Sequence, residues 1–249
     1  MPLLTIAAKV GRRERCRCLP VSLLGSRLPG DDSVTVRTRK LLAVMLTGAL
    51  AVAGLAACDP LVDGPSTPQP GVNASAAVAQ LNSLTVGGWA SMSGYSRDRF
   101  HTWESQGNGC DTRDVVLQRD GQGVVTGSNC TITAGTWFSV YDGKSVTDPQ
   151  DIDIDHMVPL ANAWRTGAAT WTDQQRAAFA NDLDRPQLIA VTMSSNRSKG
   201  DQDPSEWKPP RGDYWCTYAQ SWITVKAYWK LSVTAAEKNA LAGMLGSCT

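Results

Sequence analysis

Two polar segments of the chain hold residue types that could together hydrolyse a phosphodiester. Residues 151–160, DIDIDHMVPL, contain one of only two histidines in 249 residues, directly after an aspartate. Residues 195–201, SNRSKGD, follow about forty positions later and add amide, basic and acidic groups. A neutral histidine can take a proton from water near neutral pH, and carboxylate and amide oxygens suit a hard divalent cation. The two segments therefore predict a metal-assisted hydrolytic site.

Each polar side chain of these segments has a role in that chemistry. His156 would activate water, and Asp155 and Asn196 would supply oxygen ligands to the cation. Arg197 and Lys199 would contact the phosphate, because their charged donors bind its oxygens strongly. Adjacent residues on a strand point to opposite faces. Asp155 and His156 can therefore serve one site only where the strand kinks or ends.

The motifs resemble those of a known enzyme family. Residues 153–159, DIDHMVP, followed by residues 195–201, resemble the HNH endonucleases of the ββα-metal fold. More narrowly, the region resembles secreted actinobacterial HNH proteins related to the C-terminal domain of GmrSD-type restriction enzymes. Residues 109–113, GCDTR, and 203–207, DPSEW, are also similar to that group, over roughly residues 90–248. The resemblance implies an α+β domain with a ββα-metal core and a small antiparallel sheet, decorated by C-terminal helices. Its expected activity is cleavage of nucleic acid, with DNA favoured and RNA left open, to give 5′-phosphate and 3′-hydroxyl ends.

The resemblance also carries roles onto individual residues. His156 matches the general base, and Asp155 and Asn196 match the two protein ligands of the metal. Gln187 stands where HNH proteins usually have an asparagine that braces the loop carrying the base, and its amide could make similar hydrogen bonds. Asp153 would support the metal ligands. Because Asn196 stands where some members have histidine, Mg²⁺ or Mn²⁺ is favoured over a softer metal.

Several of these residues could instead have ordinary structural roles. Arg113 could lie near the substrate, but a position on a helix surface is equally natural. Arg197 and Lys199 could be ordinary solvated basic residues, and a lone histidine such as His156 is often a hydrogen-bonded core residue. The aspartates at 151, 153 and 155 do not form an EF-hand loop, because its sixth position would be histidine and its twelfth Asn162.

The first quarter of the chain predicts export. Residues 41–57 carry no charge and follow three basic residues, which is typical of a secretory signal, and the run is shorter than the ~20 residues of a membrane span. It ends in LAAC, which resembles the bacterial lipobox. The resemblance implies that Cys58 is lipidated and anchors the chain, with an ordinary signal peptide and an incidental cysteine as the alternative. We therefore predict four segments: an upstream extension from a start site assigned too early (1–33), a lipoprotein signal peptide (34–57), a Pro/Gly/Ser linker (58–75) and a nuclease domain (76–249). The nuclease domain would lie outside the cytoplasm, either anchored to the bacterial cell membrane or secreted.

The charge of the mature chain limits how it could bind nucleic acid. Loss of residues 1–58 removes nine of 24 basic and three of 23 acidic residues, so the net charge changes from +1 to −5. A protein that binds nucleic acid through its overall field would be basic. Contact with a nucleic acid partner must therefore be local and metal-assisted, in what we expect to be a monomer. The acidic charge and Gln187 also support a second hypothesis, an inactive nuclease scaffold that binds a partner or cell-wall component.

The cysteines predict two disulfides. Four remain after Cys58, and an even number in an exported chain is typical of disulfide bonding. Three pairings are possible. We favour Cys110–Cys130 and Cys216–Cys248, because each pair lies within one local segment. A zinc site is the alternative, but no Cys-x-x-Cys is present and histidines are nearly absent.

Periodicity and cap residues predict the elements that would position these groups. The tryptophans at 215, 222 and 229 recur every seven residues and indicate core packing. The aromatic and basic stretch 95–103 fits no element firmly. We expect helices at 76–84, 112–119, 159–166, 173–183, 214–230 and after Thr234, a short helix or turn at 194–200, and strands at 124–126, 130–133, 136–141, 151–155 and 187–192.

Overall fold

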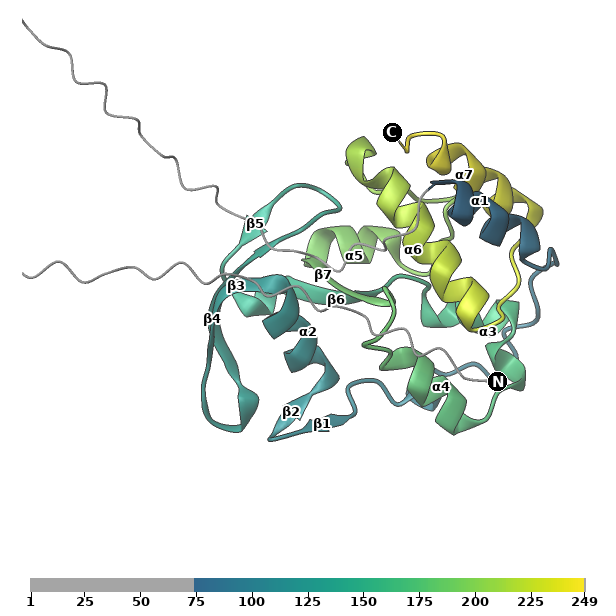
Figure 1. Cartoon of the computed structure of the whole chain (residues 1–249). Coiled ribbons are helices and arrows are strands. Elements are labelled where there is room, and N and C mark those ends of the chain that lie inside the picture. The colour runs from purple at the N-terminus through teal and green to yellow at the C-terminus, as the bar shows by residue number, and fades with distance from the viewer. Residues whose placement is uncertain (1–73, 249) are drawn as a thin grey trace, which may run out of the picture. The chain divides into compact units, whose positions relative to one another are not determined.

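The computed structural model describes residues 74–248, in which seven α-helices, several short 3₁₀ helices and seven short strands make an α+β domain (Figure 1). The predicted upstream extension, the export signal, Cys58 and nearly all of the linker lie outside the described residues. Within the described part, no helix is long and apolar enough to cross a membrane. The helices are α1 (Ala74–Ser83), α2 (Thr112–Asp120), α3 (Leu160–Thr166), α4 (Asp173–Ala180), α5 (Met193–Lys199), α6 (Trp215–Tyr228) and α7 (Ala235–Leu245). The strands are β1 (Ser105–Gly107), β2 (Cys110–Asp111), β3 (Gly121–Thr126), β4 (Ile132–Phe138), β5 (Ser145–Val146), β6 (Ile152–His156) and β7 (Leu188–Thr192).

Three helices begin at side-chain caps, at the positions where the sequence predicts their starts. Asp111 caps α2, Thr172 caps α4 and Thr234 caps α7, each by accepting a hydrogen bond from the backbone N–H of the third helical residue. In all three, the side chain at that third position bonds back to the backbone of the cap, which completes a capping box. These helix starts are confirmed because the interactions that set them are local.

Strand β4 corrects one sequence-based prediction. Residues 130–133 and 136–141 were predicted as separate strands, but Ile132–Phe138 form one strand, paired with β3 on one side and β5 on the other. The division was wrong because Gly135 does not break the strand. A Cβ at Gly135 would lie 2.6 Å from the ring of Trp137, so the glycine instead makes room for that buried indole.

Helix α4 ends earlier than predicted, at Ala180 instead of about Leu183. The next residue, Asn181, uses its side chain in tertiary contacts. Its Oδ1 accepts hydrogen bonds from the Thr112 hydroxyl (2.7 Å) and from the Glu104 backbone (3.0 Å). These contacts come from segments about seventy residues away in sequence, so helical periodicity could not reveal them.

The two-stranded antiparallel sheet β6–β7 separates two hydrophobic clusters and carries the first polar segment (Figure 1). On β6, Ile152 and Ile154 pack against the cluster that contains side chains of α2 and β4. Because side chains alternate along a strand, Asp153 and Asp155 lie on the other face, against which α5 packs. The last residue of β6 is His156.

Helices α1, α6 and α7 pack together beside this sheet (Figure 1). Trp222 on α6 is fully buried, and its indole donates a 2.7 Å hydrogen bond to Glu237 on α7. Trp215 and Trp229 are partly buried against the same core, so the tryptophan repeat packs as predicted.

Both favoured disulfides are present. Cys110–Cys130 links the β2 strand to the turn between β3 and β4, and Cys216–Cys248 links the first turn of α6 to the residues that follow α7. The sequence separations are 20 and 32 residues. The prediction of two local cross-links is therefore confirmed.

Candidate active site

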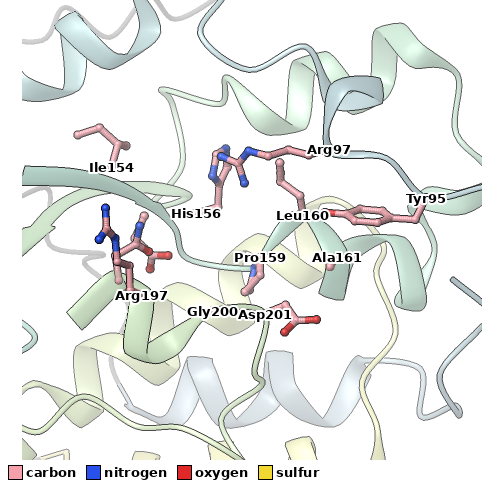
Figure 2. Close-up of a pocket in the computed structure, with 12 residues that line it drawn as sticks. Tyr95, Arg97, Ile154, His156, Pro159, Leu160, Ala161, Arg197, Gly200 and Asp201 are labelled. Atoms are coloured by element: carbon pink, nitrogen blue, oxygen red, sulfur yellow. The ribbon is translucent and has the colours of Figure 1, made fainter. Parts of the chain in front are cut away.

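A pocket of about 270 Å³ at the end of β6 brings the two polar segments together (Figure 2). Asp155 and His156 line it from β6, and Asn196 and Arg197 line it from α5. Arg97 also lines the pocket, and it comes from the 3₁₀ helix Arg97–Phe100. Asp155 and His156 follow each other on the strand, and both reach this one pocket because β6 ends at His156.

Strands β6 and β7 and helix α5 form a strand–strand–helix unit, of which β6 and α5 line the pocket. The strands pair antiparallel in continuous register from Ile152↔Thr192 to His156↔Leu188. Thr192 ends β7 and also caps α5, which turns the helix back across the sheet. As a result, the amide nitrogen of Asn196 on α5 donates a 3.0 Å hydrogen bond to Asp153 on β6.

His156 is buried and held in one tautomer. Its Nε2 lies 2.9 Å from the backbone oxygen of Ala180, the last residue of α4. A carbonyl can only accept, so Nε2 carries the hydrogen and the neutral ring keeps a lone pair on Nδ1. Burial lowers the pKa of His156 to about 3, and the charges of Arg97 and Lys199 act in the same direction. The imidazole is therefore neutral, and able to accept a proton, throughout the neutral pH range.

Gln187 holds the loop that follows His156. The side chain is fully buried, and it makes both of its hydrogen bonds to the backbone of Val158. Its Oε1 accepts from the Val158 N–H at 3.1 Å, and its Nε2 donates to the Val158 carbonyl at 3.0 Å. Val158 lies two residues beyond His156. Bonds of this kind are what we expected of Gln187 as the brace of the loop that carries His156.

Asp155 is surrounded by protein donors. The Lys199 ammonium lies 2.9 Å from Asp155 Oδ1 and 2.8 Å from the His156 carbonyl, and the Tyr141 hydroxyl donates to Asp155 Oδ2 at 2.6 Å. Burial raises the pKa of Asp155 and lowers the pKa of Lys199, and their ion pair opposes both shifts. Lys199 is fully buried and does not line the pocket. This position does not fit the phosphate contact suggested from its sequence, because the ammonium is used inside the protein.

Arg113 likewise lies away from the pocket. From α2 it donates two hydrogen bonds through Nη2, to the backbone oxygens of Pro149 (2.9 Å) and Ile152 (2.8 Å). These bonds fix the start of β6. The predicted substrate contact does not fit this arrangement, and Arg113 acts on the site by positioning the strand that carries Asp155 and His156.

The amide oxygen of Asn196 is free for a hard divalent cation, whereas the oxygens of Asp155 are largely engaged by protein donors. No residue in 74–248 donates a hydrogen bond to Asn196 Oδ1, because the amide nitrogen is the atom turned toward Asp153. A carboxylate has about four lone-pair positions, and Tyr141 and Lys199 make three contacts to those of Asp155. Among the described residues, no group of three His, Cys, Asp or Glu side chains is placed so that it could hold a metal ion by itself. Water and substrate phosphate would supply the other ligands, which is the usual arrangement for Mg²⁺.

Arg97 and Trp103 were not assigned to the site from the sequence. Arg97 lines the pocket, and the ring of Trp103 lies 5.7 Å from that of His156, measured between centroids. Both come from the aromatic and basic stretch 95–103. The available signal was a cluster of such residues that fits no helix or strand, but it gave no reason to place them near His156.

Comparison with known proteins identifies the family of this chain. The model of the C-terminal domain of GmrSD restriction endonucleases matches residues 112–244, which include β6, β7 and α5. The chain is also 51% identical, over 198 residues, to a protein of Arthroderma benhamiae described as an uncharacterized secreted protein. That match covers 80% of this chain and 95% of the relative. No solved structure matches the chain. The chain belongs to the family of the GmrSD restriction endonuclease C-terminal domain.

Proposed function

We propose that this protein is a metal-dependent endonuclease of the HNH type that hydrolyses phosphodiester bonds of nucleic acid, with DNA as its expected substrate. The observation that carries this proposal is the state of His156. Its ring is neutral, its Nε2 is used by Ala180, and its Nδ1 has no hydrogen-bond partner among residues 74–248. His156 lines one pocket together with Asn196 and Arg197. Membership of a restriction-endonuclease domain family supports nuclease chemistry.

The reaction begins with proton transfer to His156. Nδ1 takes a proton from a water molecule, whose oxygen attacks phosphorus as the bond to the 3′ oxygen breaks. The low pKa of His156 alone would make it a weak base. The negative charge of a bound phosphodiester raises that pKa, because it favours the imidazolium. The 3′ oxygen leaves and takes up a proton, so the products carry 5′-phosphate and 3′-hydroxyl ends.

Protein groups around His156 bind and orient the reactants. Arg197 is exposed on α5 and lines the pocket, where its guanidinium can grip phosphate oxygens. Asp155 and Asn196 would hold Mg²⁺ or Mn²⁺, which when bound stabilises negative charge on the phosphate and the leaving oxygen. Lys199 holds the backbone carbonyl of His156, and Gln187 holds the backbone of Val158, two residues further on.

We also propose that the protein works outside the cytoplasm. The disulfides suit an oxidising compartment, and the Arthroderma relative is described as secreted. Lipid attachment at Cys58 would tether an otherwise monomeric domain to the bacterial cell membrane. Mass spectrometry of the mature amino terminus tests this, since a diacylated Cys58 has a distinct mass and any other first residue contradicts the anchor.

One observation favours the alternative of a non-catalytic scaffold that binds a partner or cell-wall component at the cell surface. The buried ammonium of Lys199 already neutralises Asp155, which opposes the approach of a divalent cation. The two functions differ in a simple respect. Only the enzyme cuts nucleic acid when metal is added.

The decisive experiment is plasmid cleavage by the purified, disulfide-bonded chain with Mg²⁺, with Mn²⁺ and with chelator. The chain offers a matched pair of variants, His156→Asn and His101→Asn, which change its only two histidines in the same way. His101 has φ 43°, a backbone conformation that asparagine tolerates. We expect metal-dependent cutting that His156→Asn loses by ~10²-fold or more and His101→Asn retains. Cutting that is equal in both variants, or absent with DNA and RNA under every metal, would contradict the proposal.

A further inference from the structure

We propose that Arg97 is a second phosphate-binding residue of this active site, and that it contacts the phosphate on which His156 acts, from the side opposite Arg197. The proposal rests on the nuclease function proposed above and adds to it. Arg97 precedes the region that matches the family model, which begins at residue 112. A segment outside the matched region would thus complete the site.

The position of Arg97 is fixed by the core. Its 3₁₀ helix begins at Ser96, whose hydroxyl accepts from the Asp98 N–H, and ends at Phe100. Phe100 is fully buried and packs against Phe179 at 6.2 Å between ring centroids. The base of the Arg97 side chain is therefore held firmly, although its guanidinium is exposed. Figure 2 shows that group reaching toward His156, while Arg197 enters from α5 on the other side of the view.

Hydrogen bonding distinguishes Arg97 and Arg197 from every other arginine in the described residues. Residues 74–248 contain nine arginines, and in seven the guanidinium donates to a carboxylate or a backbone carbonyl. Arg97 and Arg197 have no such partner among these residues, and both line the pocket that contains His156. Two unpaired guanidinium groups converging on one pocket indicate a site for an anion.

The chemistry of the pocket identifies this anion as a phosphodiester. A guanidinium stays charged at all relevant pH values and presents parallel N–H donors that match two phosphate oxygens. A phosphodiester also carries one negative charge, which two unpaired guanidinium groups on either side of it can neutralise together. Arg97 and Arg197 would therefore hold the phosphate beside His156.

Steady-state cleavage by the purified chain tests the proposal with Arg97→Gln, Arg97→Lys and the matched control Arg99→Gln. Arg99 lies two residues on in the same short helix, and it pairs with Asp173 outside the pocket, so the control removes the same charge. We expect Arg97→Gln to lower kcat/KM by ~10²-fold or more, mainly through kcat, as when one transition-state donor is removed. Arg97→Lys keeps the charge but not the paired donors, and should lie between Arg97→Gln and wild type. Arg99→Gln should stay near wild type.

Binding measured in chelator gives a readout that a purely structural role would not move. The slope of log Kd against log salt for a DNA oligonucleotide should fall by ~1 in Arg97→Gln and remain unchanged in Arg99→Gln. If Arg97→Gln lowers the melting temperature, its loss of activity could reflect unfolding. The cleavage rate of Arg97→Lys, which keeps the charge, then tests the phosphate contact instead. A wild type that cuts, with Arg97 variants that match Arg99→Gln, overturns this assignment alone. A wild type that neither cuts nor binds nucleic acid overturns the nuclease function as well.

Discussion

The ammonium of Lys199 lies 2.9 Å from Oδ1 of Asp155, and the two residues are 0% and 3% exposed. The same ammonium bonds the His156 backbone carbonyl at 2.8 Å. A single buried lysine thus ties α5 to the residue that carries the proposed base. Its role in the site is to fix the distance between the two polar segments.

Replacement of Lys199 should destabilise the fold strongly. Lys199→Met leaves the Asp155 carboxylate buried without its partner, and loss of one member of a buried pair costs ~3–5 kcal/mol. Urea unfolding followed by circular dichroism measures this free energy. The double variant Lys199→Met, Asp155→Asn removes both charges and should regain part of the loss. A Lys199→Met protein as stable as wild type would contradict this account of the pair.

Gln187→Ala should affect both stability and catalysis. The change leaves the buried N–H and carbonyl of Val158 unpaired, which costs ~1–3 kcal/mol. The loop beyond His156 then loses its brace, so we expect kcat to fall at least tenfold with little change in KM. Gln187→Asn has a shorter side chain, so its stability and its kcat should lie between those of Gln187→Ala and wild type. Full activity at a temperature where Gln187→Ala remains folded would show that the brace serves stability only.

Sequence reasoning succeeded where interactions are local. The caps Thr172 and Thr234 and their partners lie three residues apart, so the sequence displays them directly. It failed for Lys199, because burial of that lysine depends on a carboxylate 44 residues away and on a tyrosine from a third segment. It also missed Arg97, because no motif surrounds this arginine and its place beside His156 follows from the packing of Phe100. The approach of the two polar segments to one pocket could therefore be predicted from sequence more readily than the full set of residues that line the pocket.

Removal of a proposed metal ligand should appear as a higher metal requirement. Asn196→Ala deletes the amide oxygen that no residue in 74–248 occupies, so we expect the Mg²⁺ concentration for half-maximal cleavage to rise by at least the ~10-fold seen even for residues that only support ligands. Asp153→Asn changes only the carboxylate that orients the Asn196 amide, so it should raise the Mg²⁺ concentration for half-maximal cleavage by less. Cleavage rates over a Mg²⁺ series provide the measurement. An unchanged Mg²⁺ dependence in Asn196→Ala would exclude this residue as a ligand.

The disulfide at the end of the chain should contribute to stability and not to catalysis. Cys216 and Cys248 are 32 residues apart, and a cross-link of that length stabilises by roughly 3–4 kcal/mol in the chain-entropy model. The variant Cys216→Ser, Cys248→Ser should lose about that much in urea unfolding. It should cleave at the wild-type rate at low temperature, since neither cysteine lines the pocket. A loss of kcat in the variant at a temperature where it is fully folded would link the C-terminal helices to the site.

The hydrogen bond from His156 to Ala180 places the ring at the carboxyl end of a helix. The last carbonyls of α4 carry the negative pole of the helix dipole, which interacts favourably with a positive charge. If Nδ1 takes a proton, as proposed, the imidazolium would form beside that pole. In serine proteases an aspartate orients and stabilises the catalytic histidine in this way. Here the end of a helix would fill that position, so the orientation and charge support of the proposed base come from the backbone.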